Sequence, residues 1–162
     1  MLQIRPAHPS EIEAIFAVHR DSVSALCTAH YTPAQIAMWL DGRTPVMYLD
    51  AIGTEQLWVA VDAGGAIAGF VEIDGREISK LFVRGARAGE GVGAHLLAHA
   101  LDAIRATGAA SAYLEATRNA ADFYRKHGFV ELGAGTFSRG TSGVVLEIVR
   151  MERALSSSSD RA

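Results

Sequence analysis

The sequence lacks several features that would place it in particular classes of protein. It has one cysteine, Cys27, which excludes an internal disulfide and a cysteine-rich zinc site, and whose place on the apolar side of an expected helix favours a packing role. No apolar stretch reaches the roughly 18 residues of a membrane-spanning helix, and the N-terminus does not resemble a signal peptide. We therefore expect a cytoplasmic protein with no membrane partner.

Positive charge is also scarce. The chain has 15 Lys and Arg against 18 Asp and Glu, a formal net charge of −3, and no basic stripe. Because general nucleic-acid binding relies on such a stripe, we expect no nucleic-acid partner. His95 and His99 have no third ligand at a suitable spacing, so no metal site is predicted.

The length and the composition are those of one globular domain. The chain has 162 residues, of which 49% are hydrophobic and 20% are charged. The final segment, ALSSSSDRA, is polar and has no periodicity. We expect a single domain over residues 1–153 and a disordered polar tail over residues 154–162.

Apolar periodicity in the first third predicts a strand, LQIRPA, followed by two helices. Ser10 and Glu13 have the spacing of a capping box for the first helix, and Thr32 and Gln35 have it for the second. Residues 43–55 are ambiguous and have room for one helical turn.

The remaining two thirds alternate strands with helices. Three apolar runs, QLWVAV, AIAGFVEI and EISKLFV, are separated by the turns DAGG and DGR and predict an antiparallel meander. A helix over residues 91–107 then leads to SAYLEA, which a helical crossover should place parallel to EISKLFV. A short helix, AADFYRKH, and two final strands follow. The predicted fold class is α/β, with a mixed, mostly antiparallel sheet of six to seven strands flanked by about four helices.

The segment ARAGEGVGAHLL, residues 86–97, places Gly89, Gly91 and Gly93 at alternating positions before an apolar run. Glycines at a helix start let backbone N–H groups approach a phosphate, which the helix dipole also favours. A P-loop would require Lys and then Ser or Thr directly after the last glycine, where Ala94 and His95 stand. The P-loop interpretation therefore fails.

A dinucleotide-binding fingerprint is the closer rival, because Gly89, Gly91 and Ala94 satisfy G-x-G-x-x-[G/A]. That fingerprint requires glycine directly after the strand, but the five residues RGARA separate Val83 from Gly89. Too little chain follows residue 115 for the further βαβ units of a doubly wound sheet. These points favour a wide loop that binds pyrophosphate.

Two segments carry a resemblance to a known family. ISKLFVRGARAGEGVGAHLLAHAL resembles the pyrophosphate-binding segment of the GNAT N-acetyltransferase superfamily, V-x(4)-[RQ]-x-x-G-x-[GA], and NAADFYRKHGF resembles its second acetyl-coenzyme A motif. AHYTPAQIAMW resembles the entry of a branch of small stand-alone bacterial acetyltransferases. The chain departs from the motif at Ala88 and at Glu90, where the family has basic or amide side chains. Arg84 and Arg87 are expected to supply the missing positive charge.

The resemblance implies the GNAT fold over about residues 2–153, and transfer of the acetyl group of acetyl-coenzyme A to a primary amine of a small molecule or peptide. It implies Tyr124 as the acid that protonates the leaving sulfur and Glu77 as the base, with Glu72, Glu115 and a water relay as alternatives. A non-catalytic acyl-coenzyme A-binding module and a nicotinamide oxidoreductase are the competing hypotheses. A homodimer is left open.

The resemblance also assigns two sets of binding residues. The acceptor is expected near His30, Tyr31 and Trp39. The coenzyme is expected to contact Leu81, Phe82 and Val83 through the main chain, and Arg84, Arg87, Ala88, Gly89, Glu90, Gly91, Val92, Gly93, Ala94, Asn119, Phe123 and Tyr124.

Overall fold

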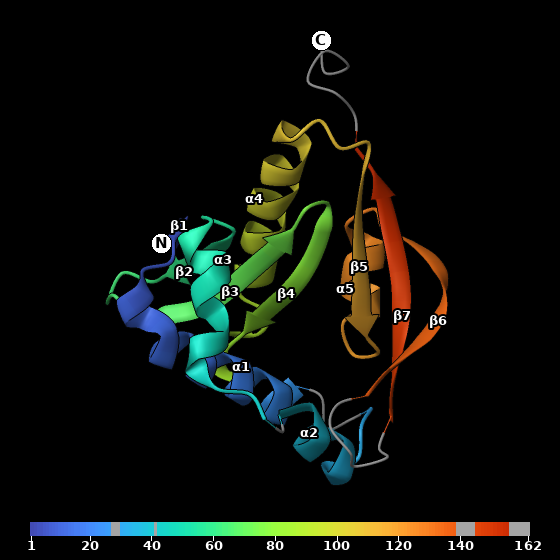
Figure 1. The fold of residues 1–162 in the computed structure, drawn as a ribbon, viewed down its shortest axis with the longest axis horizontal. Coiled ribbons are helices and arrows are strands. Elements are labelled where there is room, and N and C mark those ends of the chain that lie inside the picture. The colour runs from blue at the N-terminus through green and yellow to red at the C-terminus, as the bar shows by residue number, and fades with distance from the viewer. Residues whose placement is uncertain (27–29, 41, 139–144, 156–162) are drawn as a thin grey trace.

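The computed structural model describes residues 1–26, 30–40, 42–138 and 145–155 (Figure 1). Within them, seven strands form one sheet in the order β1-β2-β3-β4-β5-β7-β6. Every neighbouring pair is antiparallel except β4 and β5, so the predicted mixed, mostly antiparallel sheet is confirmed. The strands are β1 (Gln3–Pro6), β2 (Leu57–Val61), β3 (Ile67–Asp74), β4 (Glu77–Val83), β5 (Ser111–Thr117), β6 (Val130–Ser138) and β7 (Val145–Ala154).

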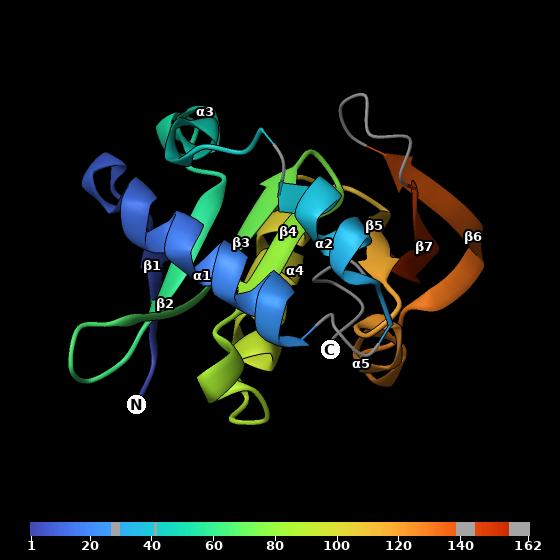
Figure 2. The same cartoon turned by 90° about the horizontal axis from the view of Figure 1, so that it is seen from below.

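Five helices flank the sheet in the described part of the chain, one more than expected. They are α1 (Ile12–Leu26), α2 (Pro33–Leu40), α3 (Leu49–Gly53), α4 (Val92–Ala106) and α5 (Ala121–Lys126). The additional helix is α3, which has five residues and occupies the segment that the sequence left ambiguous. Figure 2 shows α1, α2 and α3 on one face of the sheet and α4 and α5 on the other. None of the described helices is long and apolar enough to cross a membrane.

Each face of the sheet has its own core. On one face, the apolar side of α4 packs against β3, β5 and α5. Its six buried residues recur at the spacing of one helix face and are Val92, Leu96, Leu97, Ala100, Leu101 and Ile104. On the other face, α1 and α3 cover β2 and β3, with Tyr48 and Phe70 at the centre of the cluster. The sheet is therefore buried on both faces near β3, the strand that pairs with β4.

A short 3-10 turn, Pro9–Glu11, precedes α1, so the α-helix itself begins at Ile12 and the capping box belongs to the turn. The capping box forms between His8 and Glu11, since Glu11 accepts a hydrogen bond from the His8 N–H at 2.8 Å. Arg5 on β1 holds the same carboxylate at 2.7 Å, which draws Glu11 into this position. The predicted box of Ser10 and Glu13 is wrong for this reason. The box of the second helix is confirmed, with Thr32 and Gln35 bonded reciprocally at 3.1 and 2.9 Å.

The sheet continues slightly past the predicted end of the domain. Ala154 is the last residue of β7, and the Leu155 N–H donates to Ala110 O at 2.8 Å. The rest of the expected tail, residues 156–162, lies outside the described residues, as does Cys27.

The parallel pair β4 and β5 is the feature that shapes the site. The two strands pair only at Glu77↔Tyr113 and Ile78↔Leu114 and then diverge (Figure 1). From residue 79 onward, β4 therefore has a partner only on its β3 side, and a cleft opens toward the ends of both strands.

Candidate functional site

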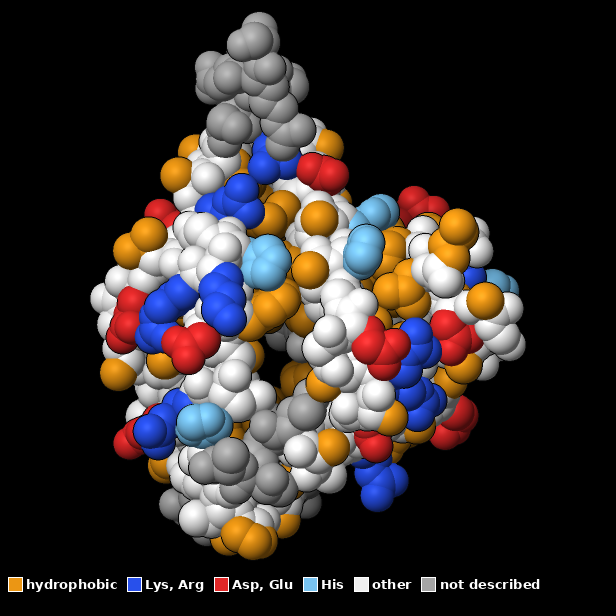
Figure 3. Space-filling view, turned by 180° about the vertical axis from the view of Figure 1, so that it is seen from behind, with side chains coloured by type: hydrophobic (Ala, Val, Ile, Leu, Met, Phe, Trp, Pro, Cys, Tyr) orange, Lys and Arg blue, Asp and Glu red, His pale blue; other side chains and the backbone are white. Residues whose placement is uncertain are grey.

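Two cavities formed by described residues meet at the cleft between β4 and β5. The larger, of about 530 Å³, lies beside the glycine loop and α5, and the smaller, of about 360 Å³, lies beside α1 and α2. Figure 3 views the molecule from the side of α4 and α5, where the surface is hollowed near its centre. The residues that line both cavities are Leu81, Phe82, Thr117, Ala120 and Tyr124.

The glycine loop forms one wall of the larger cavity. Gly89 and Gly91 have φ values of +81° and +86°, which other residues adopt only with strain, and Gly91 is the N-cap of α4. The first-turn N–H groups of α4 have no acceptor within the helix, so they can donate to an anion in the cavity. Gly93 also lines it, and a Cβ there would lie 3.4 Å from the Phe123 ring.

The two arginines that were expected to compensate for Ala88 and Glu90 behave differently. Arg87 lines the larger cavity and forms ion pairs with Asp62 at 2.9 Å and with Glu90 at 3.0 Å. Arg84 turns to the strand side of the loop, where its Nε donates to Ile67 O at 2.7 Å. The expectation that both arginines face the cavity is therefore wrong for Arg84, because a backbone carbonyl of β3 holds its guanidinium.

Asn119 lies opposite the loop, in the turn between β5 and α5. Its Oδ1 is buried and has no hydrogen-bond partner among the described residues, and the N-cap of α5 is Ala120. Buried polar atoms are nearly always paired, so an acceptor without a partner at a cavity wall suits a ligand that donates to it.

Tyr124 stands at the junction of the two cavities. Its ring packs against Phe123 and Phe129, with centroids 5.1 and 5.6 Å away, and the residue is 7% exposed. Burial raises the pKa of the Tyr124 phenol above its usual value, so the phenol stays protonated at neutral pH and can donate. Tyr124 therefore combines a buried donor with access to both cavities.

The backbone of β4 presents alternate residues to the cleft. The Arg84 N–H donates to Ala68 O at 2.9 Å, and Phe82 pairs with Phe70 in the same antiparallel ladder. Because the backbone groups of such a strand point alternately to its two sides, those of Leu81 and Val83 point to the cleft. Phe82 contributes its ring to the cavities, while its backbone bonds to β3.

A bulge in β4 directs Glu77 into the smaller cavity. The pairing steps from Glu72↔Lys80 to Ile73↔Ile78, so Ser79 is an extra residue and the alternation of side chains shifts. As a result, Ile78 packs into the α4 core, and Glu77 lines the cavity on the other face.

Two carboxylates lie at one end of the smaller cavity. Burial is the largest cause that raises the pKa of Glu77, followed by the charges of Glu115 and Asp74. Glu115 also lines the cavity and accepts a hydrogen bond from the Tyr113 hydroxyl at 3.2 Å. Glu72, the other alternative base, instead binds Lys80 and Ser79, each at 2.9 Å.

Of the three residues predicted to bind the acceptor, only Trp39 lines the smaller cavity. Tyr31 is buried behind Trp39, with ring centroids 6.1 Å apart, and its hydroxyl donates to Glu147 O at 2.7 Å and accepts from the Arg118 N–H at 2.8 Å. His30 is exposed in the turn before α2. Tyr31 therefore joins α2, β7 and the turn beside Asn119, which is a structural role.

Several residues of this cavity were not predicted from the sequence. His19 on α1 stacks on Phe82 with centroids 4.1 Å apart, and Phe137 on β6 and Arg43 after α2 complete the wall. These residues come from distant segments and form no local motif, so no signal in the sequence identifies them. No group of His, Cys, Asp or Glu in the described ranges could hold a metal ion.

Comparisons with known proteins agree with this geometry. Residues 27–150 match the family described as "Acetyltransferase (GNAT) domain". The peptidyl-lysine N-acetyltransferase YjaB of Salmonella typhimurium is 29% identical over 133 residues, which are 82% of this chain and 86% of that protein.

Two solved structures have the same fold. A GCN5-related N-acetyltransferase from Rhodopseudomonas palustris has a TM-score of 0.81 and 24% identity, with 94% of this chain and 95% of that chain covered. The PaiA N-acetyltransferase from Thermoplasma acidophilum, solved in complex with coenzyme A, has a TM-score of 0.74 and 21% identity, with 96% and 99% covered.

Proposed function

The chain belongs to the GNAT acetyltransferase family, and we propose that its two cavities bind the two substrates of acetyl transfer, acetyl-coenzyme A in the larger and a primary amine in the smaller. The activity is that of an acetyl-coenzyme A-dependent N-acetyltransferase. The observation that carries the assignment of the cavities is that they meet where β4 and β5 part, with Tyr124 lining both.

The residues of the larger cavity suit the coenzyme. The start of α4 offers backbone N–H groups to the pyrophosphate, and Gly89 and Gly91 leave room for its oxygens. Arg87 supplies positive charge, in place of the pair of arginines expected from the sequence. The Leu81 carbonyl oxygen and the backbone groups of Val83 pair with the amides of the pantetheine arm, and Asn119 Oδ1 accepts a hydrogen bond from it.

The chemistry requires removal of a proton from the acceptor, because an alkylamine titrates near ~10.4 and is mostly protonated at neutral pH. Glu77 accepts that proton, and its raised pKa makes it a stronger base than an ordinary carboxylate. Glu115 lies beside it and attracts the ammonium form as it enters.

Acetyl transfer then takes place at the junction of the two cavities, where one bond forms and another breaks. The amine nitrogen bonds to the acetyl carbon, the carbon–sulfur bond breaks, and Tyr124 gives its proton to the departing sulfur. The Leu81 N–H, at the junction, donates to the carbonyl oxygen as it gains negative charge.

The acceptor is a primary amine of a small molecule or of a peptide. The name of the Salmonella relative specifies a peptidyl lysine, which supports an amine acceptor of this kind. The cytoplasmic location stays a prediction from the sequence, and a homodimer stays open.

The test is thiol release from acetyl-coenzyme A with a panel of amines, together with the melting temperature of the protein in the presence of acetyl-coenzyme A. Saturation to about 100 times the dissociation constant should add roughly 2.7 kcal/mol to the free energy of unfolding. Stabilisation with no thiol release from any amine would instead identify a non-catalytic coenzyme-binding module. No stabilisation at millimolar acetyl-coenzyme A would contradict the assignment of the larger cavity.

A further inference from the structure

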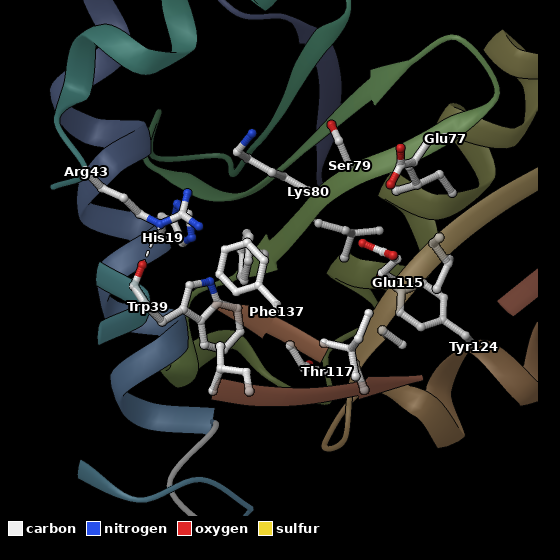
Figure 4. Close-up of a pocket in the computed structure, with 18 of the residues that line it drawn as sticks. His19, Trp39, Arg43, Glu77, Ser79, Lys80, Glu115, Thr117, Tyr124 and Phe137 are labelled. Atoms are coloured by element: carbon white, nitrogen blue, oxygen red, sulfur yellow. Dashed lines mark hydrogen bonds between the residues drawn. The ribbon is translucent and has the colours of Figure 1, made fainter. Parts of the chain in front are cut away.

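The smaller cavity contains a primary amine that belongs to the protein itself. Lys80 on β4 lines this cavity, as do Glu77 and Glu115 (Figure 4). The residue after Lys80 is Leu81, which lines both cavities. An enzyme that acetylates primary amines therefore carries one of its own lysines in the cavity assigned to the acceptor.

Lysine is scarce in this chain. Of the 15 Lys and Arg residues, only Lys80 and Lys126 are lysines. A guanidinium stays protonated in proteins, so arginine does not accept an acetyl group, whereas the neutral amine of a lysine is a nucleophile. Lys126 is exposed on α5 and is not among the described residues that line either cavity. Lys80 is therefore the lysine that lies where an acceptor would bind.

The amine of Lys80 is held by a carboxylate of the neighbouring strand. Its Nζ lies 2.9 Å from Glu72 Oε1, and the two side chains are only 19% and 12% exposed. The Ser79 hydroxyl lies 2.9 Å from the same carboxylate oxygen and 3.2 Å from the backbone oxygen of Glu72, so the bulge in β4 fixes the carboxylate. In Figure 4 the Lys80 side chain points away from Tyr124. The ion pair therefore keeps the amine away from the proposed acid.

Lys80 is nevertheless close to the proposed base. Burial is the largest cause that raises the pKa of Glu77, and the positive charges of Arg76 and Lys80 act against it. The ammonium of Lys80 is thus within electrostatic range of the Glu77 carboxylate. Its side chain is a flexible four-carbon stem, and its backbone adjoins the Leu81 N–H at the junction of the cavities.

We propose that Lys80 is an acetylation site within the enzyme itself and that Glu72 protects it by holding its ammonium. The inference rests on the proposed function, which supplies the acetyl group and the base. An amine released from Glu72 gives one proton to Glu77, and its nitrogen bonds to the acetyl carbon of acetyl-coenzyme A as the carbon–sulfur bond breaks. The nitrogen loses a second proton, which balances the proton that Tyr124 gives to the sulfur. The products are Nε-acetyl-lysine and the coenzyme thiol.

Acetylation of Lys80 would block the acceptor site. The product amide carries no charge, so it cannot form the ion pair with Glu72, and the added acetyl group takes up part of a cavity of only about 360 Å³. The enzyme would then lose its activity toward external amines. The ion pair of Lys80 and Glu72 therefore protects the activity as well as the residue.

The experiment incubates wild type and Glu72→Gln with acetyl-coenzyme A and no acceptor, and maps acetylated peptides by mass spectrometry. Acetyl-Lys80 should form at least about tenfold faster in Glu72→Gln, because a hydrogen bond to a charged group no longer holds the amine. Lys126 is the internal reference for acetylation without catalysis and should react equally in both proteins. Tyr124→Phe combined with Glu72→Gln should slow the acetylation of Lys80 by about two decades.

Activity toward an external amine gives a second measurement. The activity of Glu72→Gln should decline with the time of incubation with acetyl-coenzyme A. Lys80→Arg combined with Glu72→Gln removes the amine that is modified, so the activity of this protein should not decline over the same time. Should Glu72→Gln fail to fold, as judged by its melting curve, Glu72→Asp takes its place, since it withdraws the carboxylate by one methylene group.

Two results would overturn the inference and leave the proposed function standing, provided that external amines are acetylated. One is the absence of acetyl-Lys80 in the folded Glu72 variant, and the other is acetylation of Lys80 at the same rate in wild type or at the rate of Lys126. If neither an external amine nor Lys80 is acetylated in any of these proteins, the proposed function fails and the inference fails with it.

Discussion

Removal of the Tyr124 hydroxyl is expected to slow acetyl transfer without weakening the binding of acetyl-coenzyme A. The Tyr124→Phe substitution keeps the ring, which packs between Phe123 and Phe129, and deletes one oxygen. Burial alone shifts the pKa of this phenol and no hydrogen bond contributes among the described residues, so loss of the hydroxyl leaves no buried partner unsatisfied. The free energy of unfolding should therefore change by no more than about 0.5 kcal/mol.

The cost to catalysis should be much larger. A positioned general acid typically contributes about 10²–10⁴ in rate, so we expect turnover to fall by at least about two decades, or roughly 2.7 kcal/mol of barrier. The dissociation constant of acetyl-coenzyme A should stay within about twofold, because the phenol is not needed to hold the coenzyme. An acetyl donor with a more acidic thiol should lose less rate, since a better leaving group needs the proton less.

The assay is steady-state thiol release with both donors and one accepted amine, with coenzyme affinity measured by calorimetry. Phe129→Leu is the matched control for packing, since it alters the same ring cluster, lies in the wall of neither cavity and leaves the hydroxyl in place. Turnover of Tyr124→Phe at the wild-type rate, with the chemical step rate-limiting, would refute the assignment of the acid.

Three further substitutions test neighbouring parts of the account. Glu77→Gln should abolish turnover and raise the melting temperature at pH 7, because the raised pKa of Glu77 means that folding favours its protonated carboxyl. The gain should shrink as the pH falls and be gone below about pH 3, where wild-type Glu77 is protonated in both states. Tyr31→Phe should lower the free energy of unfolding by about 1–3 kcal/mol in urea denaturation, since two hydrogen bonds are lost. Glu90→Gln should tighten acetyl-coenzyme A binding in calorimetry by releasing Arg87, and Arg87→Ala should weaken it and reduce its dependence on salt.

Local patterns predicted the elements of this fold well. The parallel placement of β5 beside β4 followed from a helical crossover, and the capping box of Thr32 and Gln35 is confirmed. The box of Ser10 and Glu13 failed because Arg5, on a strand, holds Glu11 where it forms the box with His8 instead. These local patterns predicted the structure correctly where no side chain from a distant segment changed the local hydrogen bonds.

The candidate site was predictable where one segment builds it. The glycine loop and the helix that carries Tyr124 are continuous in sequence, and residues of both line the cavities. Arg43 and Phe137 reach the smaller cavity only through tertiary packing. The side chain of Glu77 points into the smaller cavity because of a bulge at Ser79, and the sequence pattern of β4 does not predict that bulge. Arg84 was misplaced because its partner, Ile67 O, belongs to the backbone of another strand.

The affinity of Gly93→Ala for acetyl-coenzyme A tests the central claim most directly. The added Cβ would lie 3.4 Å from Phe123 and 3.7 Å from Val83, in contact but without a clash, and alanine favours the helix by up to about 1 kcal/mol. Gly53→Ala, in α3 with nothing within 4 Å of the new Cβ, is the matched control.

Gly93→Ala should fold at least as stably as the wild type. Its dissociation constant for acetyl-coenzyme A, measured by calorimetry, should be at least about tenfold higher, or roughly 1.4 kcal/mol. Gly53→Ala should bind like the wild type. An unchanged dissociation constant in a folded Gly93→Ala protein would contradict the claim that the coenzyme lies in the larger cavity.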